Sequence, residues 1–194
     1  MNRMSETGPG EAKSAMIDRD EITNSIRAAT EDVFTTMLGL EIRAGDAYVE
    51  RNKPGVAEGV ISLVGLAGAW IGTGSVHCSA GFACKMAAHM LGTEPQEGSG
   101  RVDEEVLDAV AEISNMIIGN VKNAVEERLG PMGLSIPTVI YGRNFTTRSV
   151  GNDEWTVVPF RCGEDLLEVK ICLAPSRESH PVRHGFPPPH SIQV

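Results

Sequence analysis

Two carboxylates and one carboxamide are spaced along the chain so that a single helix face would carry all three. Asp108, Glu112 and Asn115 follow one another at intervals of four and three residues, and side chains at these intervals lie above one another on a helix. Gly119 continues the row four residues later. A glycine inside a helix costs ~1 kcal/mol, so it calls for a reason, and room for a partner surface is one. The row is therefore a candidate active site, although any amphipathic helix also carries a polar face.

The segment that carries this row is predicted to form one long helix from Asp103 to about Leu129, with Gly130 and Pro131 as its stop. At about 100° per residue, its apolar residues fall almost opposite the polar row. These apolar residues are Val106, Val110, Ile113, Ile117, Val121 and Ala124, and the stripe is widened by Leu107, Ile118 and Val125. The stripe predicts the buried face of the helix, so the row should point into solvent.

Turn residues and hydrophobic periodicity divide the rest of the chain into blocks of helices and strands. A first helix is expected from Asp20 to Leu38, where Gly39 would end it. A short helix is expected over 80–91, between a capping Ser79 and a terminating Gly92. Strands are expected over 41–50, 55–63, 69–77, 136–142, 155–161 and 166–173.

This order of elements predicts an α+β fold with a single domain over residues 19–174. Its mainly antiparallel sheet should have roughly six strands, with the long helices packed on one face. Residues 1–18 and 175–194 are polar, contain Gly or Pro and lack periodicity, so we expect disordered tails. A length of 194 residues suits one domain with tails.

The composition argues against several classes of function. A net charge of −9 disfavours nucleic acid or an anionic membrane as the main partner. No apolar run reaches the ~18 residues that span a bilayer, and the polar N-terminus does not resemble a secretory signal, so we expect a cytoplasmic protein. The four cysteines match no zinc pattern, so we expect reduced thiols and no metal site.

The polar row resembles the signature of the CheC/CheX/FliY family of response-regulator phosphatases. That signature has an Asp or Ser, then Glu four residues later and Asn three residues after that, as at Asp108, Glu112 and Asn115. A proline follows just over twenty residues on, and Pro137 is the candidate, one residue short of the usual spacing. The likeness covers roughly residues 20–174 and implies the α+β fold of this family.

The first helix indicates which branch of the family the chain resembles. Residues 33–40 (VFTTMLGL) resemble the N-terminal region of CheX-type members. CheC-type members carry a second motif on this helix, but here Glu31 is followed three residues later by Phe34 in place of an asparagine. A single site resembles the CheX pattern, which implies a homodimer presenting two identical sites.

The resemblance implies a substrate and a role for each residue of the row. The substrate would be the aspartyl phosphate of a phosphorylated CheY-type response regulator. Asn115 would position the attacking water, and Glu112 would pair with the lysine of the regulator's active site. The resemblance gives Asp108, Gly119 and Pro137 supporting or docking roles. It places the Mg²⁺ in the regulator, so the chain would need no cofactor of its own.

Two other interpretations stay open on the sequence alone. The chain could be a non-catalytic module on the same fold that binds response regulators or serves as a switch-complex adaptor, because the early Pro137 could shift the following strand. Alternatively, the row could be the solvated face of an interaction domain. The carboxamide of Asn115 favours the enzyme, since docking alone does not need it.

Overall fold

The computed structural model describes residues 18–51, 55–94, 101–147 and 154–176. Three α-helices lie within these ranges: α1 (Arg19–Val33), α2 (Ala80–Leu91) and α3 (Glu104–Leu129). Most of the predicted tails lies outside the described residues, although Asp18 caps α1 and Pro175 ends the last strand. None of the three described helices is long and apolar enough to cross a membrane.

The helix boundaries follow from residues that cap or terminate a helix. Ser79 accepts a hydrogen bond from the amide of Phe82 at 3.1 Å, and Asp103 accepts one from the amide of Val106, also at 3.1 Å. Both caps and the extents of α2 and α3 confirm the predictions. The predicted helix over 20–38 is α-helical only to Val33 and continues as a π-helical segment, Phe34–Leu38.

Eight strands form one antiparallel sheet, where about six were predicted. They are β1 (Arg43–Ala44), β2 (Tyr48–Arg51), β3 (Gly55–Gly68), β4 (Trp70–Cys78), β5 (Met132–Leu134), β6 (Thr138–Thr147), β7 (Glu154–Cys162) and β8 (Asp165–Pro175). The predicted strand over 41–50 is divided into β1 and β2, which pair with the same neighbour, β7. The short β5 was not predicted.

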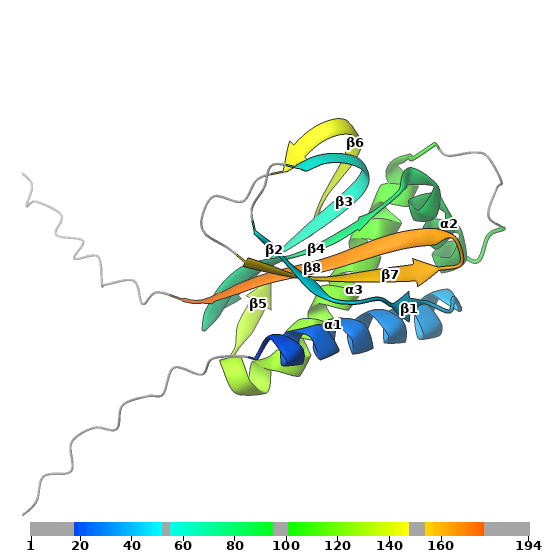
Figure 1. The fold of residues 1–194 in the computed structure, drawn as a ribbon. Coiled ribbons are helices and arrows are strands. Elements are labelled where there is room, and N and C mark those ends of the chain that lie inside the picture. The colour runs from blue at the N-terminus through cyan, green and yellow to red at the C-terminus, as the bar shows by residue number, and fades with distance from the viewer. Residues whose placement is uncertain (1–17, 52–54, 95–100, 148–153, 177–194) are drawn as a thin grey trace, which may run out of the picture.

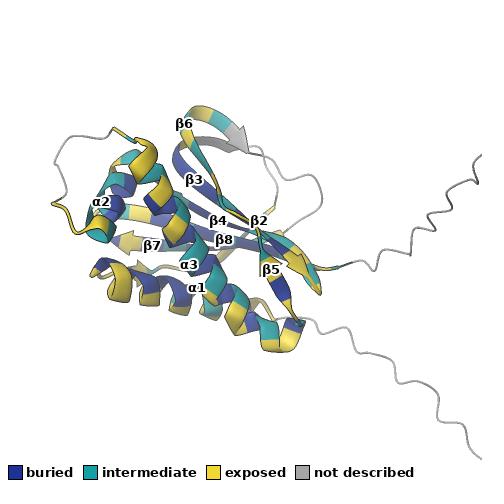
Figure 2. Ribbon diagram, turned by 180° about the vertical axis from the view of Figure 1, so that it is seen from behind, coloured by how far each residue is buried: buried dark blue, intermediate teal, exposed yellow. Residues whose placement is uncertain are grey.

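The helices lie in front of the sheet in Figure 2, and in the opposite view the strands lie in front of α3 (Figure 1). This arrangement confirms an α+β fold with its helices on one face.

The sheet is built from two halves with the same order of elements. In the first half, α1 is followed by β1 and β2, then β3 and β4; in the second, α3 is followed by β5 and β6, then β7 and β8. β4 and β8 pair at the centre. The outer strands change sides, because β1 and β2 pair with β7 while β5 and β6 pair with β3. Each half therefore completes the edge of the other, and α3 is the topological counterpart of α1.

The core lies between the sheet and the helices, and α3 contributes its apolar stripe. Val110, Ile113, Ile117 and Val121 are buried as predicted, but Val106 is only half-buried and Ala124 is exposed. The exposure of Ala124, which was predicted to be buried, has a geometric cause. Towards its C-terminal end the buried face of α3 is carried by Val125, which widened the predicted stripe, and by Leu129. These two residues pack with Met132 of β5, Trp70 of β4 and Leu173 of β8. Because a helix has 3.6 residues per turn, the positions that face the core rotate gradually along the helix, and over a helix as long as α3 other residues take over the buried face.

The packing of α3 on the sheet depends on a glycine in β4. A Cβ atom on Gly74 would lie 2.5 Å from Cδ1 of Ile118, and 2.8 Å from both of its γ carbons. Ile118 is completely buried, so it has no free space to move into. We therefore expect Gly74→Ala to lower the free energy of unfolding by about 1–3 kcal/mol through overpacking. Urea denaturation of the purified chain measures this change.

Gly81→Ala is the matched control for that substitution. Gly81 lies in the first turn of α2, and no atom would lie within 4 Å of a Cβ placed there. Alanine favours a helix over glycine, so the stability should stay equal or rise slightly. Equal stability of the Gly74→Ala variant and the wild type would contradict the proposed packing constraint.

Candidate functional site

The predicted polar row lies on α3, whose opposite face is locked into the core. Ile113, Ile117 and Ile118 are completely buried. Burying an isoleucine side chain contributes about 1.5–3 kcal/mol, so three of them hold the helix firmly. α3 also packs along α1 and against α2. Side chains on so rigid a helix have fixed origins, which suits recognition that depends on geometry.

The row is most open at its N-terminal end. Asp108 and Glu112 are exposed, whereas Asn115 and Gly119 are half-buried. Within the described part of the chain, the side chains of Asp108, Glu112 and Asn115 make no hydrogen bond or ion pair. Because neighbours at these intervals are about 5–6 Å apart, one partner can contact all three at once. The predicted row is thus a continuous patch of hydrogen-bonding groups available to a partner.

The link between β5 and β6, residues 135–137, borders the C-terminal end of the row. Both strands pair with β3 in the same direction, and the register shifts by one residue across the link. A Cβ atom on Gly119 would lie 3.5 Å from Cδ1 of Leu134, which is ordinary van der Waals contact. The glycine is therefore not required by a clash inside the chain. Ser135 ties the link to β3, because its amide donates to the carbonyl of Gly65 at 2.9 Å and its hydroxyl oxygen accepts from the amide of Gly65 at 2.8 Å.

Pro137 lies in this link, directly before β6, and is half-buried. The predicted strand over 136–142 is wrong at its start, because pairing with β3 begins at Thr138, opposite Leu63. Proline has no amide hydrogen to donate to a neighbouring strand, which explains why the ladder begins after it. The contact of Leu134 with Gly119 brings β5, and with it the link that contains Pro137, alongside α3.

The corresponding positions of α1 hold no second row of this kind. Phe34, three residues after Glu31, is completely buried. Its ring centroid lies 6.1 Å from that of Phe82 on α2. A core aromatic therefore occupies the place of the carboxamide that a second site would need.

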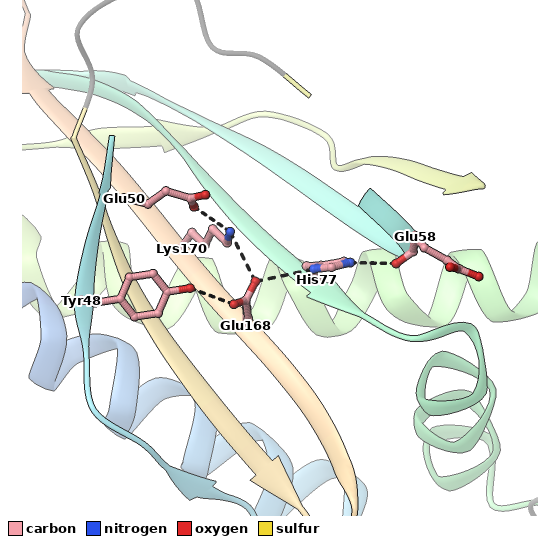
Figure 3. A network of polar contacts seen from close by, with 6 residues as sticks. All are labelled: Tyr48, Glu50, Glu58, His77, Glu168 and Lys170. Atoms are coloured by element: carbon pink, nitrogen blue, oxygen red, sulfur yellow. Dashed lines mark hydrogen bonds and ion pairs between the residues drawn. The ribbon is translucent and has the colours of Figure 1, made fainter. Parts of the chain in front are cut away.

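A second polar cluster lies on the face of the sheet that the helices do not cover (Figure 3). The Glu168 carboxylate on β8 accepts a hydrogen bond from the hydroxyl of Tyr48 at 2.9 Å. It also forms ion pairs with Nζ of Lys170 at 3.3 Å and Nδ1 of His77 at 3.6 Å. Lys170 bonds Glu50 on β2 at 2.8 Å, so the cluster joins three strands. We call these five residues the sheet-face network.

The two nitrogens of His77 explain the charges in the sheet-face network. Nε2 lies 3.0 Å from the backbone carbonyl of Glu58, while Nδ1 faces Glu168. A neutral imidazole can donate only once, so two acceptors favour the protonated ring. The carboxylate of Glu168 accordingly raises the pKa of His77. The facing imidazole, helped by Lys170 and Tyr48, lowers the pKa of Glu168 to about 2.

The same rules apply to the other two members of the network. Burial alone would lower the pKa of Lys170, but its hydrogen bond to Glu50 and the nearby Glu168 raise the pKa overall. Burial and the Glu168 carboxylate raise the pKa of Tyr48. Cations and carboxylates thus satisfy one another within the cluster.

The two clusters differ in what they leave available to a ligand. In the sheet-face network each charged group already has a partner of opposite charge, which is the pattern of a structural cluster. The row on α3 presents acceptors and donors that bond nothing in the described chain. Among the described residues, no group of three or more His, Cys, Asp or Glu side chains could hold a metal ion. The α3 row is therefore the better candidate for the functional site.

Comparisons with known proteins point to one family. The family model described as "Chemotaxis phosphatase CheX" matches residues 60–161, which include the whole α3 row. The curated CheY-P phosphatase CheX of Thermotoga maritima is 23% identical over 130 residues, covering 67% of this chain and 81% of that protein.

Solved structures of similar proteins agree with this match. The chemotaxis protein CheX from Vibrio vulnificus is 30% identical, with a TM-score of 0.66, over 79% of this chain and 99% of that one. The CheX chain of a CheX-CheY-BeF3-Mg complex from Borrelia burgdorferi is 26% identical, with a TM-score of 0.61, over 78% of this chain and 97% of that one.

The sheet-face network should make the stability of the chain depend on pH. Because the pKa of His77 is raised in the folded state, its contribution is present below its ordinary pKa of 6.5 and is lost as pH rises through the raised value. Glu168 has a lowered pKa, so its contribution is lost as pH falls from 4.5 towards about 2. The network should therefore stabilise most between these limits. Unfolding of wild type and His77→Gln, followed from about pH 5 to about pH 9, should show a difference in stability that shrinks as pH rises.

Glu168→Gln provides the control, because it removes the carboxylate that favours the charged imidazole. In that background, His77→Gln should no longer cause a pH-dependent change. A difference between wild type and His77→Gln that is constant across the whole range would contradict the charged pairing.

Proposed function

The chain belongs to the CheX family of chemotaxis phosphatases, and from that premise we propose that it hydrolyses the aspartyl phosphate of a CheY-type response regulator at the α3 row. Membership of this family and the similarity to the curated CheY-P phosphatase CheX support CheY-P phosphatase activity at the level of the family. One observation carries the assignment to this row: Glu112 and Asn115 are unpaired within the described chain, lie one turn apart on a firmly packed helix and fall inside the matched segment.

The reaction asks the protein for positioning more than for covalent chemistry. An aspartyl phosphate is a reactive acyl phosphate, and the attacking water must lie in line with the leaving carboxylate. The water oxygen forms a bond to phosphorus as the bond from phosphorus to the aspartate oxygen breaks. The products are the free carboxylate of the regulator and inorganic phosphate, which takes up the oxygen of the water together with its two protons.

We assign the positioning of the water to Asn115. Its amide oxygen can accept a hydrogen bond from the water while its NH₂ group faces the phosphoryl oxygens. The half-buried position of Asn115 supports this role, because a partly covered carboxamide has fewer rotamers than a fully exposed one. Water positioning by a side-chain amide is also how GTPases orient their nucleophile.

Glu112 is proposed to dock the regulator and not to act as a base. It lies one turn from Asn115 on the same face and is exposed, so a lysine of the regulator's active site can reach it. A charge-assisted hydrogen bond in a partly desolvated interface is worth about 1.5–3 kcal/mol. This pairing would set the register in which Asn115 meets the phosphoryl group.

The remaining residues of the site are proposed to support docking. Asp108 extends the acidic surface by one turn of the helix, Gly119 leaves space at the other end of the row, and Pro137 shapes the adjoining link between β5 and β6. We propose that the regulator holds the Mg²⁺ of the reaction and that this chain supplies no ligand to it. The solved Borrelia burgdorferi complex, in which a CheX chain is found with CheY, BeF3 and Mg, supports a CheY-type partner. A homodimer and a cytoplasmic location stay predictions from the sequence.

Asn115→Ala tests the catalytic assignment. We expect the rate of dephosphorylation of a phosphorylated CheY-type regulator with Mg²⁺ to fall by about hundredfold or more, while affinity for the regulator changes little. Release of inorganic phosphate measures the rate. Asn123→Ala is the control, because Asn123 is an exposed carboxamide on the same helix, beyond Gly119. A fully active Asn115→Ala variant would remove this residue from the mechanism.

Glu112→Ala tests the docking role. Loss of the proposed ion pair should weaken binding of the regulator, loaded with Mg²⁺ and beryllium trifluoride, by about ten- to a hundredfold. Isothermal titration calorimetry measures the affinity. Glu127→Ala, which removes an exposed carboxylate outside the row, should leave it unchanged. Unchanged affinity of the Glu112→Ala variant would refute the pairing with the regulator's lysine.

A further inference from the structure

We propose that Ile136 is a docking residue for the regulator, an apolar knob beside the α3 row that inserts into the receiver domain as it binds. This inference rests on the proposed function and names a further residue of the same site. It extends the site from one helix to the link between β5 and β6.

The exposure of Ile136 is unusual among the described residues. Its side chain is 89% exposed, whereas the next most exposed large hydrophobic side chain, Leu166, reaches 53%. Single apolar residues on a surface are common and need no explanation by themselves. Two further features set Ile136 apart: its backbone is held rigidly, and it lies next to the α3 row.

The backbone of Ile136 is held from both sides. On one side, Ser135 exchanges two hydrogen bonds with Gly65 on β3, and its hydroxyl donates to the carbonyl of Ile136 at 3.0 Å. On the other side, Pro137 fixes its own φ and restricts the residue before it to extended conformations. An apolar side chain displayed on a fixed backbone loses little conformational freedom on binding, so more of the energy of its burial goes into affinity.

Ile136 is also contiguous with the α3 row. Leu134, two residues earlier, lies against Gly119, with its Cδ1 atom 3.5 Å from the position a Cβ would take there. Two residues of extended chain span at most ~7 Å. Ile136 therefore projects from the border of the row, at the end opposite Asp108. Figure 2 shows β5 alongside the C-terminal part of α3, on the side away from α2.

The chemistry of the combined surface fits a receiver domain docked over its phosphorylation site. Glu112 would contact the active-site lysine and Asn115 the phosphoryl group, in the partly desolvated contact proposed above. Interfaces combine such polar contacts with buried apolar anchors, and a few of these anchors carry much of the affinity. Ile136 supplies an anchor of this kind at the side of the row that Leu134 borders. The partner should offer an apolar recess beside its active site.

The test compares two substitutions at Ile136 with the same two at Leu166. Leu166 lies on β8, next to Leu167 of the core, and so faces the side of the sheet away from the helices. The full chain is titrated with a CheY-type regulator loaded with Mg²⁺ and beryllium trifluoride. Ile136→Ala should weaken affinity about tenfold and Ile136→Asp further, while both Leu166 variants bind as the wild type does.

Turnover separates docking from chemistry. Ile136→Ala should raise the regulator concentration that gives half-maximal dephosphorylation, with the maximal rate near that of the wild type. Both Ile136 variants should unfold at the urea concentration of the wild type, since the side chain contributes nothing to the core. Wild-type affinity in Ile136→Asp, together with loss of turnover in Asn115→Ala, would overturn the role of Ile136 and leave the proposed function standing. A wild-type chain that neither binds nor dephosphorylates the regulator would overturn both.

Discussion

The contact of Ile118 with the bare backbone of Gly74 decides how α3 lies on the sheet. A side chain at position 74 would occupy the volume that Ile118 fills, so β4 admits the helix at this point through a residue without a Cβ. Helix rotation is then fixed, because Ile113 and Ile117 must enter the core together with Ile118. The direction in which the polar row points is a consequence of that apolar packing and requires no interaction of its own.

The two polar clusters show opposite uses of charged residues in one small domain. On the uncovered side of the sheet, His77, Glu168 and Lys170 neutralise one another across neighbouring strands. On the helical side, Asp108 and Glu112 face outward without partners in the described chain. Unpaired carboxylates contribute little to folding, so their place on a rigid helix is better explained by binding than by stability. The two clusters therefore differ in whether their charged groups already have partners of opposite charge.

Local sequence signals predicted the helices well and the sheet less well. Ser79 and Asp103 cap their helices through their own side chains, so their effect is readable within three or four residues. The extent of α3 and the alignment of its polar row follow from the same short-range periodicity. The family motif then gave the row a chemical interpretation that spacing alone did not.

Features set by distant contacts could not be predicted in the same way. The short β5 forms because β3 continues to Gly68 and offers it an edge. The exposure of Ile136 depends on Ser135 bonding to Gly65, 70 residues away in the sequence. The sheet-face network joins residues as far apart as Tyr48 and Glu168, which are 120 residues apart. No local pattern reports such pairings, which is why the border of the site emerged only in three dimensions.

The exchange of edge strands between the two halves has a consequence for the order of events during synthesis. β1 and β2 leave the ribosome early, but their neighbour, β7, is among the last segments to emerge. The N-terminal strands must wait for nearly the whole domain, and closing so long a loop is slow. Neither half can acquire a complete sheet alone, so a nascent chain that stops after α3 would carry the α3 row over β3 and β4 but would lack β5 to β8. The sheet beneath the row is thus completed only at the end of translation.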